Sequence, residues 1–86
     1  MASYSVEISA TAERQIRKLG AQDRIRVLRA IRDLATTPRP PGCRKLRGYQ
    51  DVFRIRAGRF RVLYSVEDQR LVVIVLKVGD RRDVYR

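Results

Sequence analysis

Three arginines in the second half of the chain have the type and spacing to bind a phosphate group. Arg54 and Arg56 are separated by one residue, and Arg61 follows shortly after a Gly58-Arg59 pair. Because alternate residues of a strand share a face and a tight turn brings neighbouring strands together, Arg61 is predicted to lie beside Arg56 or Arg54. Like charges placed across neighbouring strands are destabilising. We therefore expect an anionic ligand on this surface.

A second interpretation treats these arginines as an ordinary solvated face of a sheet. Charged side chains are common on such faces, and three carboxylates could neutralise individual arginines: Asp51, Asp80 and Asp83. For Arg59 and Arg82, a solvated role and a functional role fit the sequence equally well. The two interpretations differ in whether the arginines gather in one place or are scattered among carboxylates.

The overall charge indicates which class of anion to expect. The chain has 86 residues, with 20 Lys and Arg against 9 Asp and Glu, and carries a formal net charge of +11. Its isoelectric point is near 11.2. A field of this sign attracts polyanions, and nucleic acid is the commonest polyanion of a cytoplasm. The composition therefore favours nucleic acid as the partner.

Other features of the composition argue against several kinds of function. The sequence has no histidine and a single cysteine, Cys43, so no metal site, internal disulfide or cofactor is expected. Acid-base chemistry is left to tyrosine, lysine or a carboxylate. The longest apolar run, residues 71–76, is far shorter than a membrane span, and no signal peptide is evident. A cytoplasmic protein with no membrane partner is expected.

The first half of the chain has patterns typical of one strand and two helices. Residues 4–9 alternate between apolar and polar side chains, which predicts a half-buried strand. The apolar spacing then becomes helical, with Ser9 or Thr11 available as the N-cap and Gly20 expected to end the helix. A second helical pattern follows until Pro38 stops it. Two helices joined across Gly20 would form an antiparallel hairpin.

The second half of the chain has patterns typical of strands. Beyond a proline-rich loop at 38–42, three such runs occupy residues 52–57, 60–66 and 71–78, and residues 83–85 could add a final short strand. Their short connections require antiparallel neighbours. The run 71–78 is apolar at nearly every position, which predicts a central strand covered on both faces.

Together these elements predict an α+β fold in one domain, residues 1–86. An antiparallel helical hairpin would pack on one face of a four- to five-stranded, mainly antiparallel sheet that includes the N-terminal strand. Since two helices can cover only one face, the other face, here called the open face, must meet solvent or a partner. We expect the functional site on the open face, where Arg54, Arg56 and Arg61 are predicted to project.

Four motifs follow one another in the second half of the chain: K-L-R-G at 45–48, V-F-R-I-R at 52–56, G-R-F-R-V-L-Y at 58–64 and V-G-D-R-R-D-V-Y at 78–85. In this order, and with the preceding strand and helix pair, they resemble the RelE toxins of the RelE/ParE superfamily, which belong to bacterial type II toxin-antitoxin systems. The resemblance covers essentially the whole chain. It implies the RelE/ParE-like fold and the activity of a ribosome-dependent mRNA endonuclease.

The implied reaction needs no metal. In the family, the mRNA 2′-hydroxyl attacks the adjacent phosphate and leaves a 2′,3′-cyclic phosphate and a 5′-hydroxyl end. Carried over position by position, the resemblance implies five catalytic residues: Arg54, Arg56, Arg61, Arg81 and Tyr85. Further basic residues are expected to bind RNA: Arg44, Lys45, Arg47, Arg59 and Arg82.

Three positions depart from the best-known RelE members. Those members often have lysines at the positions of Arg54 and Arg56, and arginine does not readily lose a proton to act as a base. Either Tyr85 takes that role or catalysis relies on orientation and electrostatics alone. Asp80 stands where relatives often have histidine or lysine, which places an anion near the phosphate.

The resemblance also implies partners, and it leaves alternatives open. The partners are a cognate RelB-like antitoxin, the A site of the small ribosomal subunit with its mRNA and rRNA, and operator DNA only through the antitoxin complex. An alternative is a ParE-like toxin, which shares the scaffold but inhibits DNA gyrase without nuclease chemistry. A third is an inert module that binds RNA or DNA. Several cations and an aromatic residue converging on the open face favour the RelE interpretation.

Overall fold

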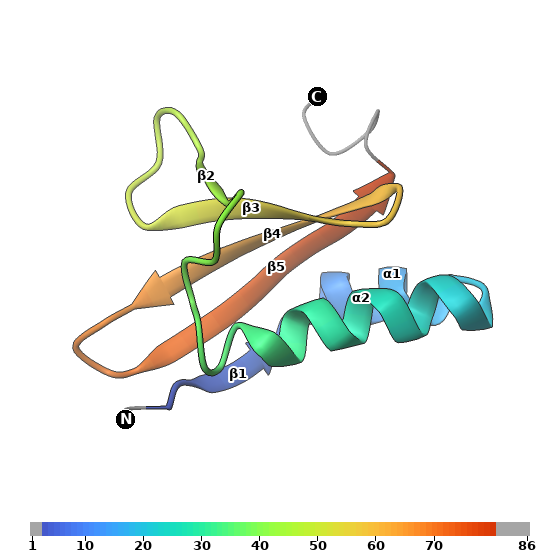
Figure 1. The fold of residues 1–86 in the computed structure, drawn as a ribbon, viewed down its shortest axis with the longest axis horizontal. Helices are drawn as coiled ribbons and strands as arrows, with labels where there is room; N and C mark the ends of the chain where they lie inside the picture. The colour runs from blue at the N-terminus through green and yellow to red at the C-terminus, as the bar shows by residue number, and fades with distance from the viewer. Residues whose placement is uncertain (1–2, 81–86) are drawn as a thin grey trace.

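A five-stranded sheet with two helices on one face forms the described part of the chain, residues 3–80 of the computed structural model (Figure 1). The elements are β1 Ser5–Ile8, α1 Ala10–Arg17, α2 Ala21–Asp33, β2 Arg44–Lys45, β3 Val52–Ala57, β4 Phe60–Glu67 and β5 Val72–Asp80. The strand order is β1-β5-β4-β3-β2. β1 runs parallel to β5, and the other neighbours are antiparallel. The predicted α+β fold is confirmed, while the predicted strand at 83–85 lies outside the described residues.

The first helix begins as predicted and ends differently. The side chain of Ser9 is the N-cap of α1 and accepts a hydrogen bond from the Ala12 N–H. The helix ends at Arg17, where the Lys18 N–H bonds back to the carbonyl of Gln15. The prediction that Gly20 ends this helix was wrong, because Gly20 is the N-cap of α2 with an ordinary φ of −63°. The last turn of α1 closes without a left-handed residue, so no C-terminal glycine is needed.

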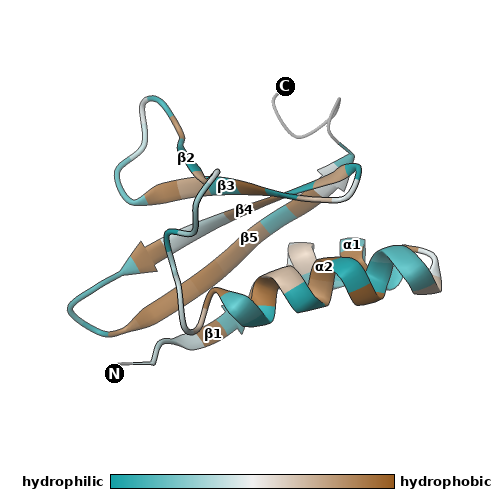
Figure 2. Cartoon of the chain, viewed as in Figure 1, coloured by the Kyte–Doolittle hydropathy of each residue, from teal (hydrophilic) through white to brown (hydrophobic). Residues whose placement is uncertain are grey.

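The hydrophobic core lies between the sheet and the two helices. Phe60, Val62, Tyr64 and Val66 of β4 are all buried, as their alternation predicts. They pack with the apolar stripes of the helices, and Figure 2 shows hydrophobic residues along β4, β5 and α2. Neither of the two helices in the described residues has the length and apolar character needed to cross a bilayer.

β5 differs from its prediction. It lies between β1 and β4, but neither helix of residues 3–80 packs on the open face, where Leu76 is 37% exposed and Lys77 is exposed. The pairing with β4 also shifts register, since Tyr64 lies opposite Val75 whereas Leu63 lies opposite Lys77. Leu76 is therefore an extra residue, and β5 contains a β-bulge at this point.

The proline-rich loop is held against the sheet by side chains from distant parts of the chain. The Tyr64 hydroxyl donates a 2.9 Å hydrogen bond to the carbonyl of Pro38, and burial raises the pKa of this tyrosine. Arg39 pairs with Asp68 at 2.8 Å and stacks 5.1 Å from the centre of the Phe53 ring. The Tyr4 hydroxyl also donates to Asp68, at 2.7 Å. These contacts fix where the chain leaves the loop and enters β2.

Candidate functional site

Arg61 of β4 lies directly opposite Arg56 of β3, which is one of the two neighbours that the sequence allows for it. The two strands are joined by a two-residue turn at Gly58-Arg59, with φ of +64° at Gly58. A glycine with positive φ at the first turn position matches the twist of a hairpin and keeps it tight. Phe53, Ile55 and the alternate residues of β4 point into the core. Both arginines therefore project from the open face.

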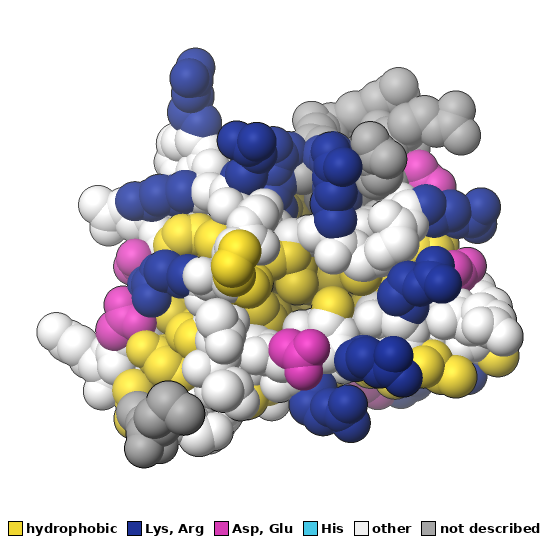
Figure 3. Space-filling view, viewed as in Figure 1, with side chains coloured by type: hydrophobic (Ala, Val, Ile, Leu, Met, Phe, Trp, Pro, Cys, Tyr) yellow, Lys and Arg dark blue, Asp and Glu magenta, His cyan; other side chains and the backbone are white. Residues whose placement is uncertain are grey.

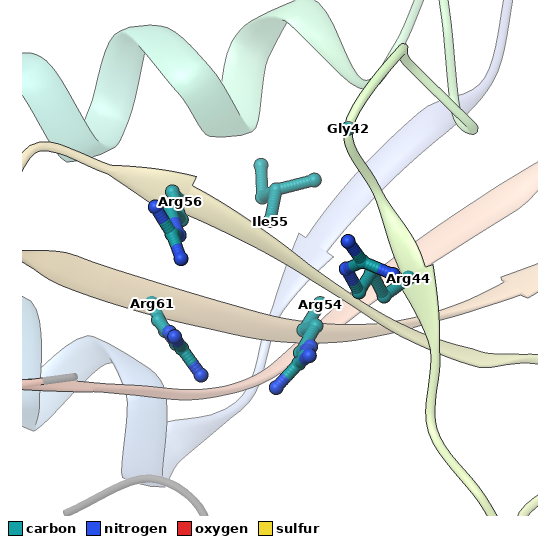
Figure 4. Close-up of a pocket in the computed structure, with 6 residues that line it drawn as sticks. All are labelled: Gly42, Arg44, Arg54, Ile55, Arg56 and Arg61. Atoms are coloured by element: carbon teal, nitrogen blue, oxygen red, sulfur yellow. The ribbon is translucent and has the colours of Figure 1, made fainter. Parts of the chain in front are cut away.

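A second pair of arginines adjoins the first. Arg44 of β2 lies opposite Arg54 of β3, so β2 adds a cation to the same face. The four arginines line one hollow of about 30 Å³ together with Gly42 and Ile55 (Figure 4). A space of this size holds little more than a water molecule. The hollow is therefore a gap between guanidinium groups, suited to the oxygens of an anion lying on the surface.

Several of the chain's carboxylates are engaged in ion pairs away from this cluster. Glu13 pairs with Arg17 on α1, Glu67 pairs with Arg70, and Asp68 pairs with Arg39 beside the proline-rich loop. In Figure 3, Lys and Arg side chains gather over the part of the molecule where Figure 1 places β2 and β3. With +11 on the whole chain, this surface attracts anions.

The structure places three of the predicted RNA-binding residues outside the cluster. Lys45 lies opposite Phe53, so it is on the other side of β2 from Arg44. Arg47 follows in the loop between β2 and β3. The side chains of Lys45 and Arg47 are both exposed. Arg59, in the turn, stacks 5.1 Å from the centre of the Phe60 ring. Arg59 does not line the hollow formed by Arg44, Arg54, Arg56 and Arg61.

Three other predicted residues, Arg81, Arg82 and Tyr85, lie outside the described residues. Among the described residues, Lys77 also lies on this surface, although the sequence did not predict it there. Lys77 lies opposite Leu63, and Leu63 lies opposite Arg54, so Lys77 belongs to the same cross-strand row as Arg54 and Arg44. A strict alternation from the buried Val73 and Val75 would turn it into the core. The signal that could have identified Lys77 was the presence of one lysine in the otherwise apolar run 71–78.

The chain matches known proteins along nearly its whole length. A family model for the ParE toxin of the parDE type II toxin-antitoxin system matches residues 6–85. The chain is 33% identical over 84 residues to Toxin RelG of Mycobacterium tuberculosis, which covers 96% of this chain and 97% of the relative. It is 32% identical over 87 residues to the mRNA interferase toxin RelE of Escherichia coli, which covers 96% of this chain and 90% of the relative.

The fold matches solved structures equally well. The RelBE2 toxin-antitoxin complex of Mycobacterium tuberculosis has a chain that is 30% identical, with a TM-score of 0.82 and coverage of 96% of this chain and 97% of that chain. The archaeal RelE-RelB complex of Pyrococcus horikoshii gives 29% identity, a TM-score of 0.83 and coverage of 95% and 99%. The chain therefore belongs to the RelE/ParE family and is a RelE-like toxin of a type II toxin-antitoxin system.

Proposed function

We propose that this toxin is a metal-independent endoribonuclease that cuts mRNA in the ribosomal A site and so stops translation. The observation that carries the proposal is the pairing of Arg56 with Arg61, beside Arg54 and Arg44, on a face that the helices leave open. Such a group of guanidiniums suits the phosphates of RNA. The name of the Escherichia coli relative, an mRNA interferase, supports the same activity.

The proposed reaction is a transesterification at one phosphate of the RNA. The 2′-oxygen of a ribose attacks the adjacent phosphorus and loses its proton, while the bond from phosphorus to the 5′-oxygen breaks and that oxygen gains a proton. Negative charge builds on the non-bridging oxygens during the attack. Guanidiniums already held in place stabilise this charge more than they stabilise the ground state. Arginine suits the role because its planar group can bind two phosphate oxygens at once.

Each predicted site residue has a proposed role. Arg61 and Arg81 clamp the non-bridging oxygens, with Arg81 toward the leaving 5′-oxygen, and Tyr85 stacks on a base or orients the 2′-hydroxyl. Arg54 and Arg56 hold the phosphate but do not act as bases, since arginine keeps its proton. Basic residues around this centre bind flanking RNA or rRNA: Arg44, Lys45, Arg47, Arg59 and Arg82.

We also propose a cognate RelB-like antitoxin as the partner that silences the toxin. Solved complexes of similar chains contain such antitoxins, in Mycobacterium tuberculosis, Pyrococcus horikoshii and Escherichia coli. The net charge of +11 favours an acidic or amphipathic antitoxin segment that folds on binding. Operator DNA would be contacted through the antitoxin complex.

Brief expression of the toxin in a bacterium, followed by mapping of mRNA 5′ ends, tests the proposed activity. New 5′-hydroxyl ends are expected inside translated messages, and none are expected with the Arg61→Ala variant. Supercoiling by purified DNA gyrase is assayed in parallel and should be unaffected. Growth arrest with no new mRNA ends would overturn the proposal.

A ParE-like action on gyrase is the second candidate, because the matching family model describes a ParE toxin. It predicts inhibited supercoiling and intact mRNA. It also gives no role to guanidiniums gathered on the open face, such as the Arg56 and Arg61 pair. For that reason we favour the endoribonuclease.

A further inference from the structure

We propose that Lys77 is a phosphate-binding residue and that RNA lies across the strands of the open face, from β2 to β5. The inference rests on the proposed function and extends it to a residue outside the predicted site. Its basis is the β-bulge in β5, which determines the face on which Lys77 lies. The bulge is in turn held by the side chains of Ser9, the N-cap of α1, and Gln15 of α1.

The bulge reverses the alternation of β5. Val73 and Val75 are buried on the core side, and in a regular strand the next side chain on that side would be Lys77. Because Leu76 is the extra residue, Val78 takes the core position instead and is 2% exposed. Lys77 is then exposed and lies opposite Leu63 on the open face. Bulges commonly re-aim a side chain in this way beside functional sites.

Side chains from the start and middle of α1 hold the bulged segment. β1 pairs with β5 only as far as Val75, so none of the described strands pairs with the following residues of β5 on that side. The Ser9 hydroxyl donates to the Leu76 carbonyl at 3.0 Å, and the Val78 N–H donates to Gln15 Oε1 at 2.7 Å. The backbone groups on both sides of Lys77 are therefore satisfied. The bulge is a fixed part of the fold.

The resulting cations form two rows across the sheet. One row contains Arg44, Arg54 and Lys77, with Leu63 between the last two. The other contains Arg56 and Arg61 and ends at Gly79 of β5, which has no side chain.

Strand spacing sets the size of these rows. Arg44 and Lys77 are three strand spacings apart, or about 14 Å, and the rows are about 7 Å apart. A single strand of RNA laid across β2 to β5 could therefore place neighbouring phosphates on different members of the two rows. Both rows lie on the open face, where the proposed function places RNA, so we assign them to RNA and test an acidic polypeptide as the alternative.

The test measures binding of a short single-stranded RNA in which every 2′-hydroxyl is methylated, so that it can bind but cannot be cut. Affinity is recorded by fluorescence anisotropy over a series of salt concentrations for wild type, Lys77→Gln, Lys77→Arg and Lys18→Gln. Lys18 is exposed just after α1 and provides a control that loses the same charge elsewhere. Each lost phosphate contact should lower the slope of log affinity against log salt by about 0.7 for a single strand.

The expected result is a several-fold weaker affinity and the smaller slope for Lys77→Gln, and wild-type slopes for Lys77→Arg and Lys18→Gln. An unchanged slope for Lys77→Gln, or an equal change in both glutamine variants, would overturn the inference. Poly-L-glutamate serves as the acidic-protein probe, and an equal loss of affinity for it would assign Lys77 to a protein partner instead. In each of these cases the mRNA-end experiment judges the proposed function separately, because it depends on cleavage and on Arg61.

Discussion

Arg56 and Arg61 face each other across the β3–β4 hairpin, with both positive side chains on the open face of the sheet. Directly opposed like charges weaken strand pairing by some tenths of a kcal/mol. An anion bound between the two arginines would reduce this repulsion.

Replacing Arg56 by glutamine is expected to separate stability from function. Arg56 is exposed, so its replacement relieves repulsion and should leave the free energy of unfolding unchanged or raise it by about 0.2–1 kcal/mol. Growth arrest and mRNA cleavage should be strongly reduced. Urea unfolding and a toxicity assay in the same host measure the two effects. A toxic variant, or a variant less stable by more than about 1 kcal/mol, would contradict this account.

Gly58 should not tolerate a side chain. Its φ of +64° favours glycine, and a Cβ there would lie 2.8 Å from Cδ of Arg26 on α2. Gly58→Ala is expected to destabilise the hairpin by about 1 kcal/mol or more. Adding Arg26→Ala removes the close contact and should restore part of the loss, because only the backbone strain remains. Full recovery in the double variant would show that backbone conformation plays no part.

Two substitutions of Gln15 by residues of similar size should differ in stability, because Gln15 accepts a hydrogen bond from the Val78 N–H. Gln15→Met leaves a partly buried N–H without an acceptor and should cost about 1–3 kcal/mol. Gln15→Glu keeps an acceptor oxygen at that position and should remain close to wild type. Thermal unfolding monitored by circular dichroism makes the comparison. Equal losses in both variants would mean that the bond to β5 is not what Gln15 contributes.

Asp68 predicts how stability depends on pH. Hydrogen bonds from Arg39 and then from Tyr4 lower the pKa of its carboxyl below the ordinary 3.8. Because the folded pKa is the lower one, the stabilisation is present above the unfolded pKa and is lost as the pH falls through the folded value. Asp68→Asn should therefore be less stable than wild type at neutral pH and lose less stability on acidification. Glu7→Gln removes an exposed carboxylate of β1 and is the matched control, expected to follow the wild-type acid profile.

The Asp68 prediction fails if the two variants lose stability in parallel as the pH is lowered from about 5 to 2. Such a result would mean that the loop contacts of Arg39 and Tyr4 do not depend on the charge of Asp68. The unfolding midpoint in urea at each pH provides the measurement.

The part of the site that alternation and a tight turn determine could be predicted from the sequence. The strand bounds Val52–Ala57 follow from local pattern alone. Local pattern also places Arg61 beside Arg56 or Arg54, and the structure shows that the partner is Arg56. The position of Arg44 could not be predicted, because β2 is a two-residue strand whose pairing depends on the path of the proline-rich loop. That path depends on Arg39 meeting Asp68, which lies 29 residues away in the sequence.

Lys77 shows the limit of local pattern most clearly. Its face depends on a bulge whose backbone groups bond to Ser9 and Gln15, separated from their partners by 67 and 63 residues. The alternation of side chains along β5 carries no information about these bonds. The coverage of β5 was predicted incorrectly for a different reason, because an apolar run does not show which faces of its strand the helices cover.

The parallel pairing of β1 with β5 joins the earliest strand to the last one described. During synthesis, β1 and α1 have no strand to dock on until β5 has left the exit tunnel of the ribosome, and contacts between such distant segments form late. A nascent chain halted before β5 therefore carries its arginines on an unfinished sheet. The sheet that displays the arginines is therefore complete only after β5 has been made and has joined β1 to β4.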